Sequence, residues 1–212
     1  MSAALALIDR AGLEELSMRN LAAELGTGTT TLYRNVAGKE EVLVLVVDAV
    51  AGEVRPPHPH PTGDIGWREV LEGLARSFRE ALCAHPHAVP LFAMAVPVGP
   101  NSLRGRELAL GLLRERGFDK SLAADVYTAV AHHVLASALQ EPMLDFRTGG
   151  LGSTRALTLR TFYRSLPAEQ FPHVVELADE LTERTAEEEF EFGLRCLLDG
   201  VELRLKQAGT HS

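Results

Sequence analysis

Apolar residues recur along most of this chain at the spacing of an α-helix. Residues three, four and seven positions apart share one face of a helix, whereas alternate residues share one face of a strand. The helical segments end at glycine or proline, and no strand-like alternation or internal repeat interrupts them. The pattern therefore predicts an all-α fold for the 212 residues, a length that suits one or two domains.

Helix boundaries follow from the same signals. Gly12 and Gly26 are expected to end the first two helices, and Pro142 the long central one. Residues 143–172 contain several glycines, so we expect this segment to be mobile in part, with a short helix near 157–166. The predicted helices are 3–11, 18–25, a short one that buries Leu32 and Val36, 39–51, 67–85, a short piece at 91–94, 102–116, 121–140, 172–183 and 186–206.

The segment from Ser17 to Val36 predicts a helix-turn-helix. Ser17 is a good N-cap for a helix with apolar residues at helical spacing, and Gly26 ends that helix. A second short helix must follow within two or three residues, because Leu32 and Val36 are four apart and can share a buried face. The second helix of such a pair can enter the major groove of DNA. Its outward face would carry Gly28, Thr29, Thr31, Tyr33 and Arg34.

The charge distribution qualifies this interpretation. The whole chain has a net charge of -8, which discourages indiscriminate binding to DNA. Between Ser17 and Lys39, however, the sequence contains three cations, Arg19, Arg34 and Lys39, and one carboxylate, Glu24. This stretch therefore carries a net charge of +2. Nonspecific affinity should therefore be weak and sensitive to salt, since only a few phosphates per subunit can be neutralised.

This stretch resembles the DNA-binding domain of the tetracycline-repressor (TetR) family of bacterial transcription regulators. The resemblance spans about residues 3–54 and rests on Leu16-Ser-x-Arg19-x-Leu-Ala22-x-x-Leu25-Gly26, followed by Thr31-Leu32-Tyr33-x-x-Val36-x-x-Lys39. It implies an N-terminal three-helix domain with the helix-turn-helix and a larger C-terminal helical domain for ligand binding and dimerisation. It also implies a repressor that leaves its double-stranded DNA operator when a small molecule binds.

The candidate DNA contacts divide by chemistry. Thr29, Thr30, Thr31 and Arg34 are candidates for contacts to bases or close to them, because they lie on the second helix. Phosphate contacts are expected from a second group, and these fix the position of the protein without reading sequence. That group is Arg19, Tyr33 and Lys39, and Met18 and Gly28 complete the predicted DNA-binding set.

A proline-rich stretch divides the chain. Residues 55–66 favour turns and polyproline conformation, so we expect a linker there, between a DNA-binding domain at 1–54 and a ligand-binding and dimerisation domain at 67–212. Histidines in and after this stretch are interpreted as solvated loop residues and not as metal ligands, because no cysteine or carboxylate shares their short spacing. They are His58, His60, His85 and His87.

The last predicted helix has apolar residues on two sides. Phe190, Leu194 and Leu198 belong to one row, while Phe192 and Leu203 belong to a second. One packing partner cannot cover both, so the helix is either buried deep in the monomer or part of a subunit interface. We favour a homodimer through a four-helix bundle of residues near 121–140 and 186–206, because a helix-turn-helix repressor needs two half-sites.

Residues 67–140 and 172–207 resemble the C-terminal domain of the tetracycline repressor itself, more loosely than the first match. In that relative the domain encloses a drug chelated to magnesium. Its metal-binding histidine falls at Phe92, its metal-side glutamate at Gln140, and an asparagine that anchors the drug at Leu74. Phenylalanine and glutamine cannot replace that imidazole and carboxylate. We therefore predict an effector other than a magnesium-tetracycline complex, apolar or amphipathic, with no metal site and no cofactor.

A cavity in the same place would be mainly apolar, as small-molecule pockets are. The alternative for any single residue is an ordinary place in the core. His132 and His133 diverge by about 100° around the helix axis, so at most one of them is expected to face a cavity. The predicted lining is Leu74, Phe78, Phe92, Met94, Ala109, Leu112, Val130, His133 and Gln140.

Other function classes find little support. An enzyme is not predicted, because the sequence has no nucleophile–histidine arrangement at telling spacing, no phosphate-binding loop and no metal motif. No membrane partner is expected, since no apolar run approaches about 18 residues and no signal peptide precedes the first helix. Cys83 and Cys196 are expected to be reduced core residues of a cytoplasmic protein. A further alternative is a protein that kept this fold but lost the ability to bind DNA, and that binds protein partners instead.

Overall fold

The computed structural model describes residues 2–56, 66–148 and 151–209, and side chains within 2–56, 66–140 and 156–207. These ranges contain helices and no strand, which confirms the predicted all-α fold. The elements are α1 (Ser2–Ala11), a 3₁₀ turn η1 (Leu13–Glu15), α2 (Met18–Glu24), α3 (Thr29–Tyr33), α4 (Lys39–Ala51), α5 (Trp67–Ala84), α6 (Leu91–Met94), α7 (Pro100–Glu115), α8 (Lys120–Thr148), α9 (Leu151–Arg164), α10 (Pro172–Glu176), α11 (Glu180–Glu183) and α12 (Ala186–Gly209).

The first three helices form the expected helix-turn-helix unit. The Ser17 hydroxyl caps α2 by accepting a hydrogen bond from the Asn20 amide at 3.1 Å. Gly12 and Gly26 end α1 and α2 with φ angles of 85° and 62°, a region that glycine enters without the steric cost that a Cβ imposes. Leu32 is the buried residue of α3, so the remaining faces of this short helix are left to solvent.

Helix α4 joins the helix-turn-helix to the rest of the molecule. Val46, Val47 and Val50 are fully buried, and the helix packs against α1 and also against α5, α6 and α7. A single cluster of buried apolar side chains therefore continues from α1 through α4 to α12. If α4 moved, its contacts with α1 and its contacts with α5, α6 and α7 would both have to change.

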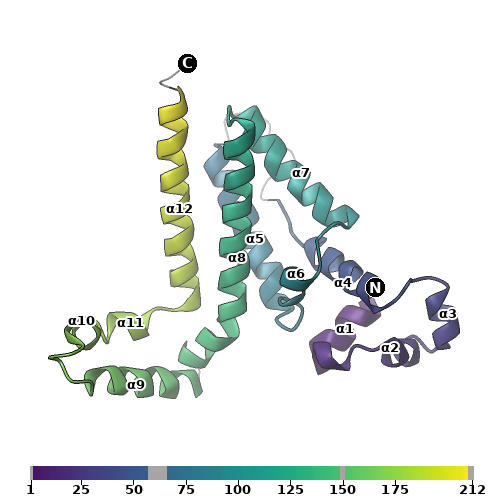
Figure 1. Ribbon diagram of the computed structural model, residues 1–212, viewed down its shortest axis with the longest axis horizontal. Helices are drawn as coiled ribbons and strands as arrows, with labels where there is room; N and C mark the ends of the chain where they lie inside the picture. Colours follow the sequence, from purple (N-terminus) through teal and green to yellow (C-terminus); the bar gives the residue numbers. More distant parts are fainter. Residues whose placement is uncertain (1, 57–65, 149–150, 210–212) are drawn as a thin grey trace.

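The centre of the molecule is α8, which packs against α5, α7 and α12 (Figure 1). His133 belongs to the α8–α12 contact. Its ring stacks on that of Phe190 with centroids 5.3 Å apart, and its Nε2 lies 2.9 Å from the Phe190 carbonyl oxygen. Gly193 makes this approach possible, because a Cβ there would lie 2.4 Å from the His133 ring. His133 thus holds two helices together.

Helix α8 is longer than predicted. It continues through Pro142 to Thr148, although a proline was expected to end it at residue 140. Proline removes one backbone hydrogen bond and bends a helix, but it does not always stop one. The predicted short helix at 157–166 is likewise the longer α9, and the predicted helix at 172–183 is divided into α10 and α11. Residues 149 and 150 lie outside the described ranges.

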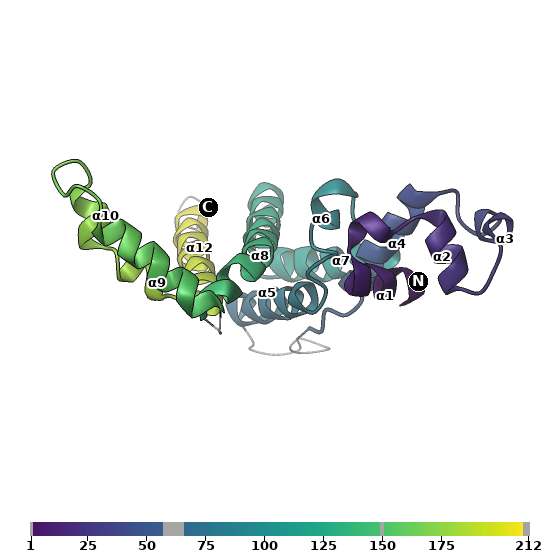
Figure 2. The same ribbon diagram turned by 90° about the horizontal axis from the view of Figure 1, so that it is seen from below.

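Helices α9, α10 and α11 lie at the end of the molecule opposite to α1, α2 and α3 (Figure 2). Arg160 and Arg164 on α9 both form ion pairs with Asp179, just before α11, and these hold the group together. Several apolar side chains in it remain exposed. They are Leu157, Phe162, Phe171, Leu177 and Leu181.

By length and composition, one helical stretch in the described part of the chain could cross a membrane, Lys120–Gln140 of α8. Core helices of soluble proteins meet the same criterion. Only 28% of its most apolar window is buried within the chain, so much of its apolar surface is left uncovered. Cys196 on α12 is exposed as well, which corrects the prediction that both cysteines are core residues.

His85 connects three segments and is not a solvated loop residue. Its Nδ1 lies 2.8 Å from Asp9 of α1, and its Nε2 lies 3.1 Å from Glu53, after α4. Nearby, the His87 ring approaches the carbonyl oxygens of Ile8 and Asp9. The two histidines after α5 therefore hold the C-terminal end of α1. His58 and His60 lie outside the described residues.

The His85 contacts predict a pH-dependent stability. Burial lowers the pKa of His85, but hydrogen bonds and charges from Asp9 and Glu53 outweigh burial and raise the pKa above 6.5. The stabilisation is therefore complete below the unfolded pKa and is lost as the pH rises through the raised folded pKa.

His85→Gln should lower the free energy of unfolding by about 1 kcal/mol at about pH 5.5 and by less at about pH 9, a small value because both carboxylates are partly exposed. Urea unfolding at the two pH values measures the difference. His173→Gln, at a side chain 85% exposed on α10, is the matched control. An equal loss for His85→Gln at both pH values would contradict the ion-pair role.

Candidate functional site

The predicted DNA-binding residues form one exposed surface on α2, α3 and the start of α4. Tyr33 is 55% exposed, although it is a large aromatic residue with an apolar ring. Met18 differs from the rest, because it is half-buried and packs against the core. The exposed members are Arg19, Gly28, Thr29, Thr30, Thr31, Tyr33, Arg34 and Lys39.

The charges on this surface are arranged to leave cations available. Glu24 forms an ion pair with Arg10 at 2.8 Å, and the hydrogen bond and charge of that guanidinium lower the pKa of Glu24. In the described part of the chain, no carboxylate lies within ion-pair distance of Arg19, Arg34 or Lys39. The surface is therefore suited to phosphate, despite the acidic character of the whole chain.

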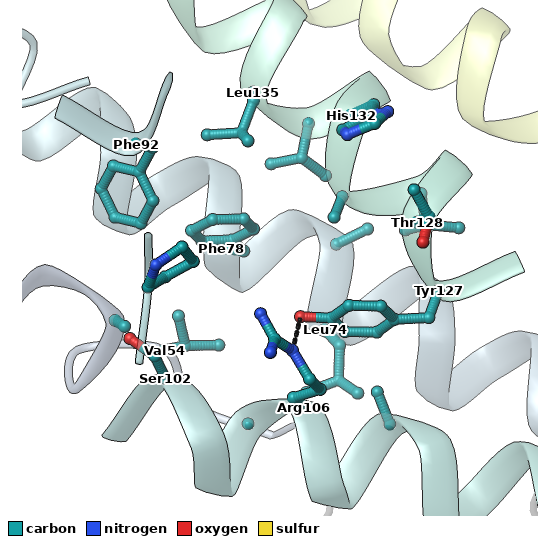
Figure 3. A pocket seen from close by; sticks show the side chains of 18 of the residues that line it. Val54, Leu74, Phe78, Phe92, Ser102, Arg106, Tyr127, Thr128, His132 and Leu135 are labelled. Atoms are coloured by element: carbon teal, nitrogen blue, oxygen red, sulfur yellow. Dashed lines mark hydrogen bonds between the residues drawn. The ribbon is translucent and has the colours of Figure 1, made fainter. Parts of the chain in front are cut away.

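A cavity of about 390 Å³ lies between α4, α5, α7 and α8 (Figure 3). This volume is in the range of small-molecule pockets. Aliphatic and aromatic side chains make most of its wall, with a few polar groups from α7 and α8. The described lining is Ala51, Val54, Leu71, Leu74, Ala75, Phe78, Phe92, Pro97, Asn101, Ser102, Gly105, Arg106, Ala109, Tyr127, Thr128, Val130, Ala131, His132, Val134 and Leu135.

Part of the predicted lining is brought together here. The predicted residues that are found in the wall come from the apolar faces of α5, α7 and α8, together with the phenylalanine of α6. Phe78 and Phe92 meet edge to face with ring centroids 5.7 Å apart, so they form an aromatic corner. The members of the predicted set that line the cavity are Leu74, Phe78, Phe92, Ala109 and Val130.

Four predicted lining residues lie elsewhere. Met94 is 68% exposed at the end of α6, and Gln140 is exposed on α8 beyond the last residue that reaches the cavity. Leu112 is buried in the core, one turn past Ala109 on α7. His133 packs on Phe190, as described above, and its neighbour His132 lines the cavity instead. One histidine of the pair does line the cavity, but it is His132 and not the predicted His133.

The polar residues of the wall were not predicted from the sequence. Arg106 projects from α7, and its Nε donates a hydrogen bond to the Tyr127 hydroxyl oxygen of α8 at 3.3 Å. Its guanidinium carbon lies 5.7 Å from the centre of the Tyr127 ring. Ser102 and Arg106 are four residues apart on a predicted helix, which places them on one face. That spacing was the available signal, but it does not reveal what the face contacts.

A buried carboxylate joins α4 to the wall of the cavity. Asp48 is 6% exposed, and its Oδ1 accepts hydrogen bonds from the amides of Asn101 and Ser102, both at 2.9 Å. Asn101 returns a hydrogen bond from its side-chain nitrogen to the Asp48 carbonyl oxygen at 3.2 Å. Gly99 allows this approach, because a Cβ there would lie 2.2 Å from the Asp48 carboxyl carbon. Asp48 therefore fixes the N-terminal end of α7 on α4.

Two family models cover nearly the whole chain. Residues 1–46 match the model for bacterial regulatory proteins of the tetR family, and residues 58–205 match the tetracyclin repressor-like C-terminal domain. The resemblance seen in the sequence is thus confirmed in both halves.

Individual relatives agree with the family models. The chain is 34% identical to the HTH-type transcriptional repressor DrrR1 of Streptomyces coeruleorubidus, over 98% of this chain and 77% of that protein. It is 36% identical to apo ActR of Streptomyces coelicolor, with a TM-score of 0.86 over 98% of this chain and 94% of that one. ActR in complex with actinorhodin gives a TM-score of 0.85 at 36% identity, over 96% and 95%. The chain is a member of the TetR family of helix-turn-helix transcription regulators, with a tetracycline-repressor-like C-terminal domain.

Proposed function

We propose that this protein is a ligand-responsive repressor, which binds operator DNA and is released by a small molecule. One observation carries the proposal. Helix α4 follows directly on the helix-turn-helix, and its C-terminal end provides Ala51 and the adjacent Val54 to the wall of the cavity. A ligand in the cavity would touch the same helix that orients α3. The fold of ActR, which has been seen both without ligand and with actinorhodin, supports this assignment.

The effector is proposed not to be a magnesium-tetracycline complex. Phe92, at the position of the metal-binding histidine in the tetracycline repressor, offers the cavity an aromatic ring with no lone pair for a metal. Gln140, at the position of the metal-side glutamate, is exposed and outside the cavity wall. Magnesium prefers oxygen ligands, carboxylates above all, and the described wall contains no carboxylate. An organic ligand bound without metal fits these residues better.

The proposed release mechanism is a shift between two orientations of α4. The N-terminal end of α7 is attached to α4 through Asp48, and Asn101 and Ser102 also line the cavity. Ligand that separates α7 from α8 would therefore pull on α4 and change the spacing of two recognition helices. The ligand must bind the DNA-free orientation more tightly, typically by about 1–3 kcal/mol of coupling.

The protein is proposed to act as a homodimer in the cytoplasm, with a linker at 55–66 between its DNA-binding and ligand-binding domains. The apolar surface of α8 and α12 supports the dimer. Leu139 on α8 is 44% exposed, and Phe192 and Leu203 on α12 are 52% and 62% exposed. A second copy related by a two-fold axis could cover these side chains in a four-helix bundle. Two recognition helices would then be available for two half-sites.

The DNA-binding proposal is tested by gel shift against the DNA upstream of the protein's own gene. If Arg34 reads a base, Arg34→Ala should relax discrimination by about 1–3 kcal/mol at one position of the operator. Lys39→Ala should instead weaken binding to all sequences and reduce the salt slope by about 0.9 if it holds one phosphate. Arg164→Ala removes the same charge from an exposed arginine of α9, at the opposite end of the molecule from α3 (Figure 2), and should change neither quantity. Equal loss on all sequences for Arg34→Ala would assign Arg34 to the backbone.

The Asp48 attachment predicts a specific loss of stability. Asp48→Ala removes the acceptor of two α7 amides and should lower the free energy of unfolding by about 1–2 kcal/mol. Amide exchange measured residue by residue should accelerate at the start of α7 and also along α4. Asp119→Ala is the control, because Asp119 caps the Leu122 amide of α8 at an exposed site. Faster exchange in α7 with α4 unchanged would argue against coupling through Asp48.

The dimer proposal predicts that charge on α12 separates the subunits. Phe192→Glu and Leu203→Glu would each bury a carboxylate in the interface, at a cost of several kcal/mol. Light scattering should then report monomers, and operator affinity should fall by about 10²–10⁴, the gain that two linked sites provide. Val96→Glu alters an equally exposed apolar residue away from α12, at 69% exposure, and should leave a dimer. A monomeric wild-type protein would overturn this part of the proposal.

A further inference from the structure

The cavity wall contains one permanent cation and no carboxylate among its described residues. The cation is Arg106, which is half-buried on α7. Two other half-buried arginines, Arg68 and Arg160, form ion pairs with carboxylates. Arg68, for example, lies 2.7 Å from Asp199 and 3.0 Å from Glu72. In the described part of the chain no carboxylate lies within 4.0 Å of the Arg106 guanidinium. Arg106 therefore brings an uncompensated positive charge to an apolar cavity.

Most hydrogen-bonding capacity of Arg106 is unused. A guanidinium has five N–H donors, and in the described structure the Tyr127 hydroxyl takes one of them. The Tyr127 hydroxyl in turn keeps its own proton to donate. In the view of Figure 3 this pair lies below the Phe78 and Phe92 rings, and the guanidinium points into the space between the helices. An acceptor in the cavity would meet several donors from one side.

Ser102 is a further polar residue of the cavity wall. It lies one helical turn before Arg106 and lines the same cavity. Its hydroxyl oxygen is buried and has no hydrogen-bond partner among the described residues. Because this oxygen has almost no accessible surface, a group in the cavity would reach it only after the side chain rotates. The donors presented to the cavity are therefore those of Arg106 and Tyr127.

We propose that the cavity selects aromatic ligands that carry an acidic oxygen group such as a carboxylate. The acid would be held by Arg106, with Tyr127 as a further donor, because a guanidinium matches the two oxygens of a carboxylate. The ring system would pack against Leu74, Phe78 and Phe92. This inference rests on the proposed function of the cavity as the effector site, and it adds the charge and ring character of the effector.

The test compares two probes with the same rings, anthracene-2-carboxylate and anthracene-2-carboxamide, titrated into the full-length protein by calorimetry. Wild-type protein is expected to bind the carboxylate at least about 10-fold more tightly, the equivalent of about 1.4 kcal/mol. Arg106→Gln should abolish this preference, because it removes the positive charge and keeps a polar side chain. Arg104→Gln removes an exposed arginine from the same helix, outside the cavity wall, and should keep the preference.

The outcomes separate this inference from the cavity proposal. Equal wild-type affinity for both probes overturns the acid selectivity, as does a preference that survives Arg106→Gln; the comparison in wild-type protein needs no variant to fold. Leu74→Trp, which fills the cavity, should abolish binding of both probes. If both probes bind equally and Leu74→Trp abolishes them, the cavity proposal stands and only the selectivity fails. If Leu74→Trp leaves the affinity for the probes unchanged, or if neither probe binds, the selectivity is overturned. Either result also counts against the cavity as a ligand site.

Discussion

The attachment of α4 to α7 through the Asp48 carboxylate is the constraint on which the rest of the structure depends. A buried carboxylate is costly unless its oxygens are hydrogen-bonded, and here one oxygen accepts the amides of Asn101 and Ser102. The same two amides would otherwise be left unsatisfied at the start of α7. Each group therefore requires the other, and this makes the relative position of the two helices specific. Apolar packing, which tolerates sliding, would not fix it so closely.

That attachment gives the cavity a direct connection to the DNA-binding surface. The cavity lies where α4, α5, α7 and α8 converge, and residues of α4 and the start of α7 form part of its wall. Helix α4 also packs on α1, whose C-terminal end is held by His85 and His87. The helix-turn-helix is thus linked to the larger part of the chain at two separate points, one of them sensitive to pH.

Charge is distributed by local pairing and not by overall composition. The chain is acidic, yet Glu24 is paired with Arg10, and the three cations near the recognition helix have no carboxylate partner in the described structure. The same contrast occurs inside. Arg68 and Arg76 of α5 form ion pairs with Asp199 and Glu191 of α12, whereas Arg106 faces the cavity without a carboxylate partner in the described structure. Unmatched cations in a protein with a net charge of -8 mark the two surfaces at which ligands are proposed to bind.

The sequence determined the helices, the helix-turn-helix and the family, because these depend on short-range periodicity, caps and glycine turns. The helix predicted near 39–51 is α4, and Ser17 and Gly26 act as predicted. Which helix faces which neighbour was decided only by the tertiary structure. Periodicity does not distinguish His132 from His133, since both are polar residues on one apolar helix, and only α12 packing on one side separates them. Arg106, Ser102 and Asp48 acquire their roles from contacts between distant segments, which no local spacing encodes.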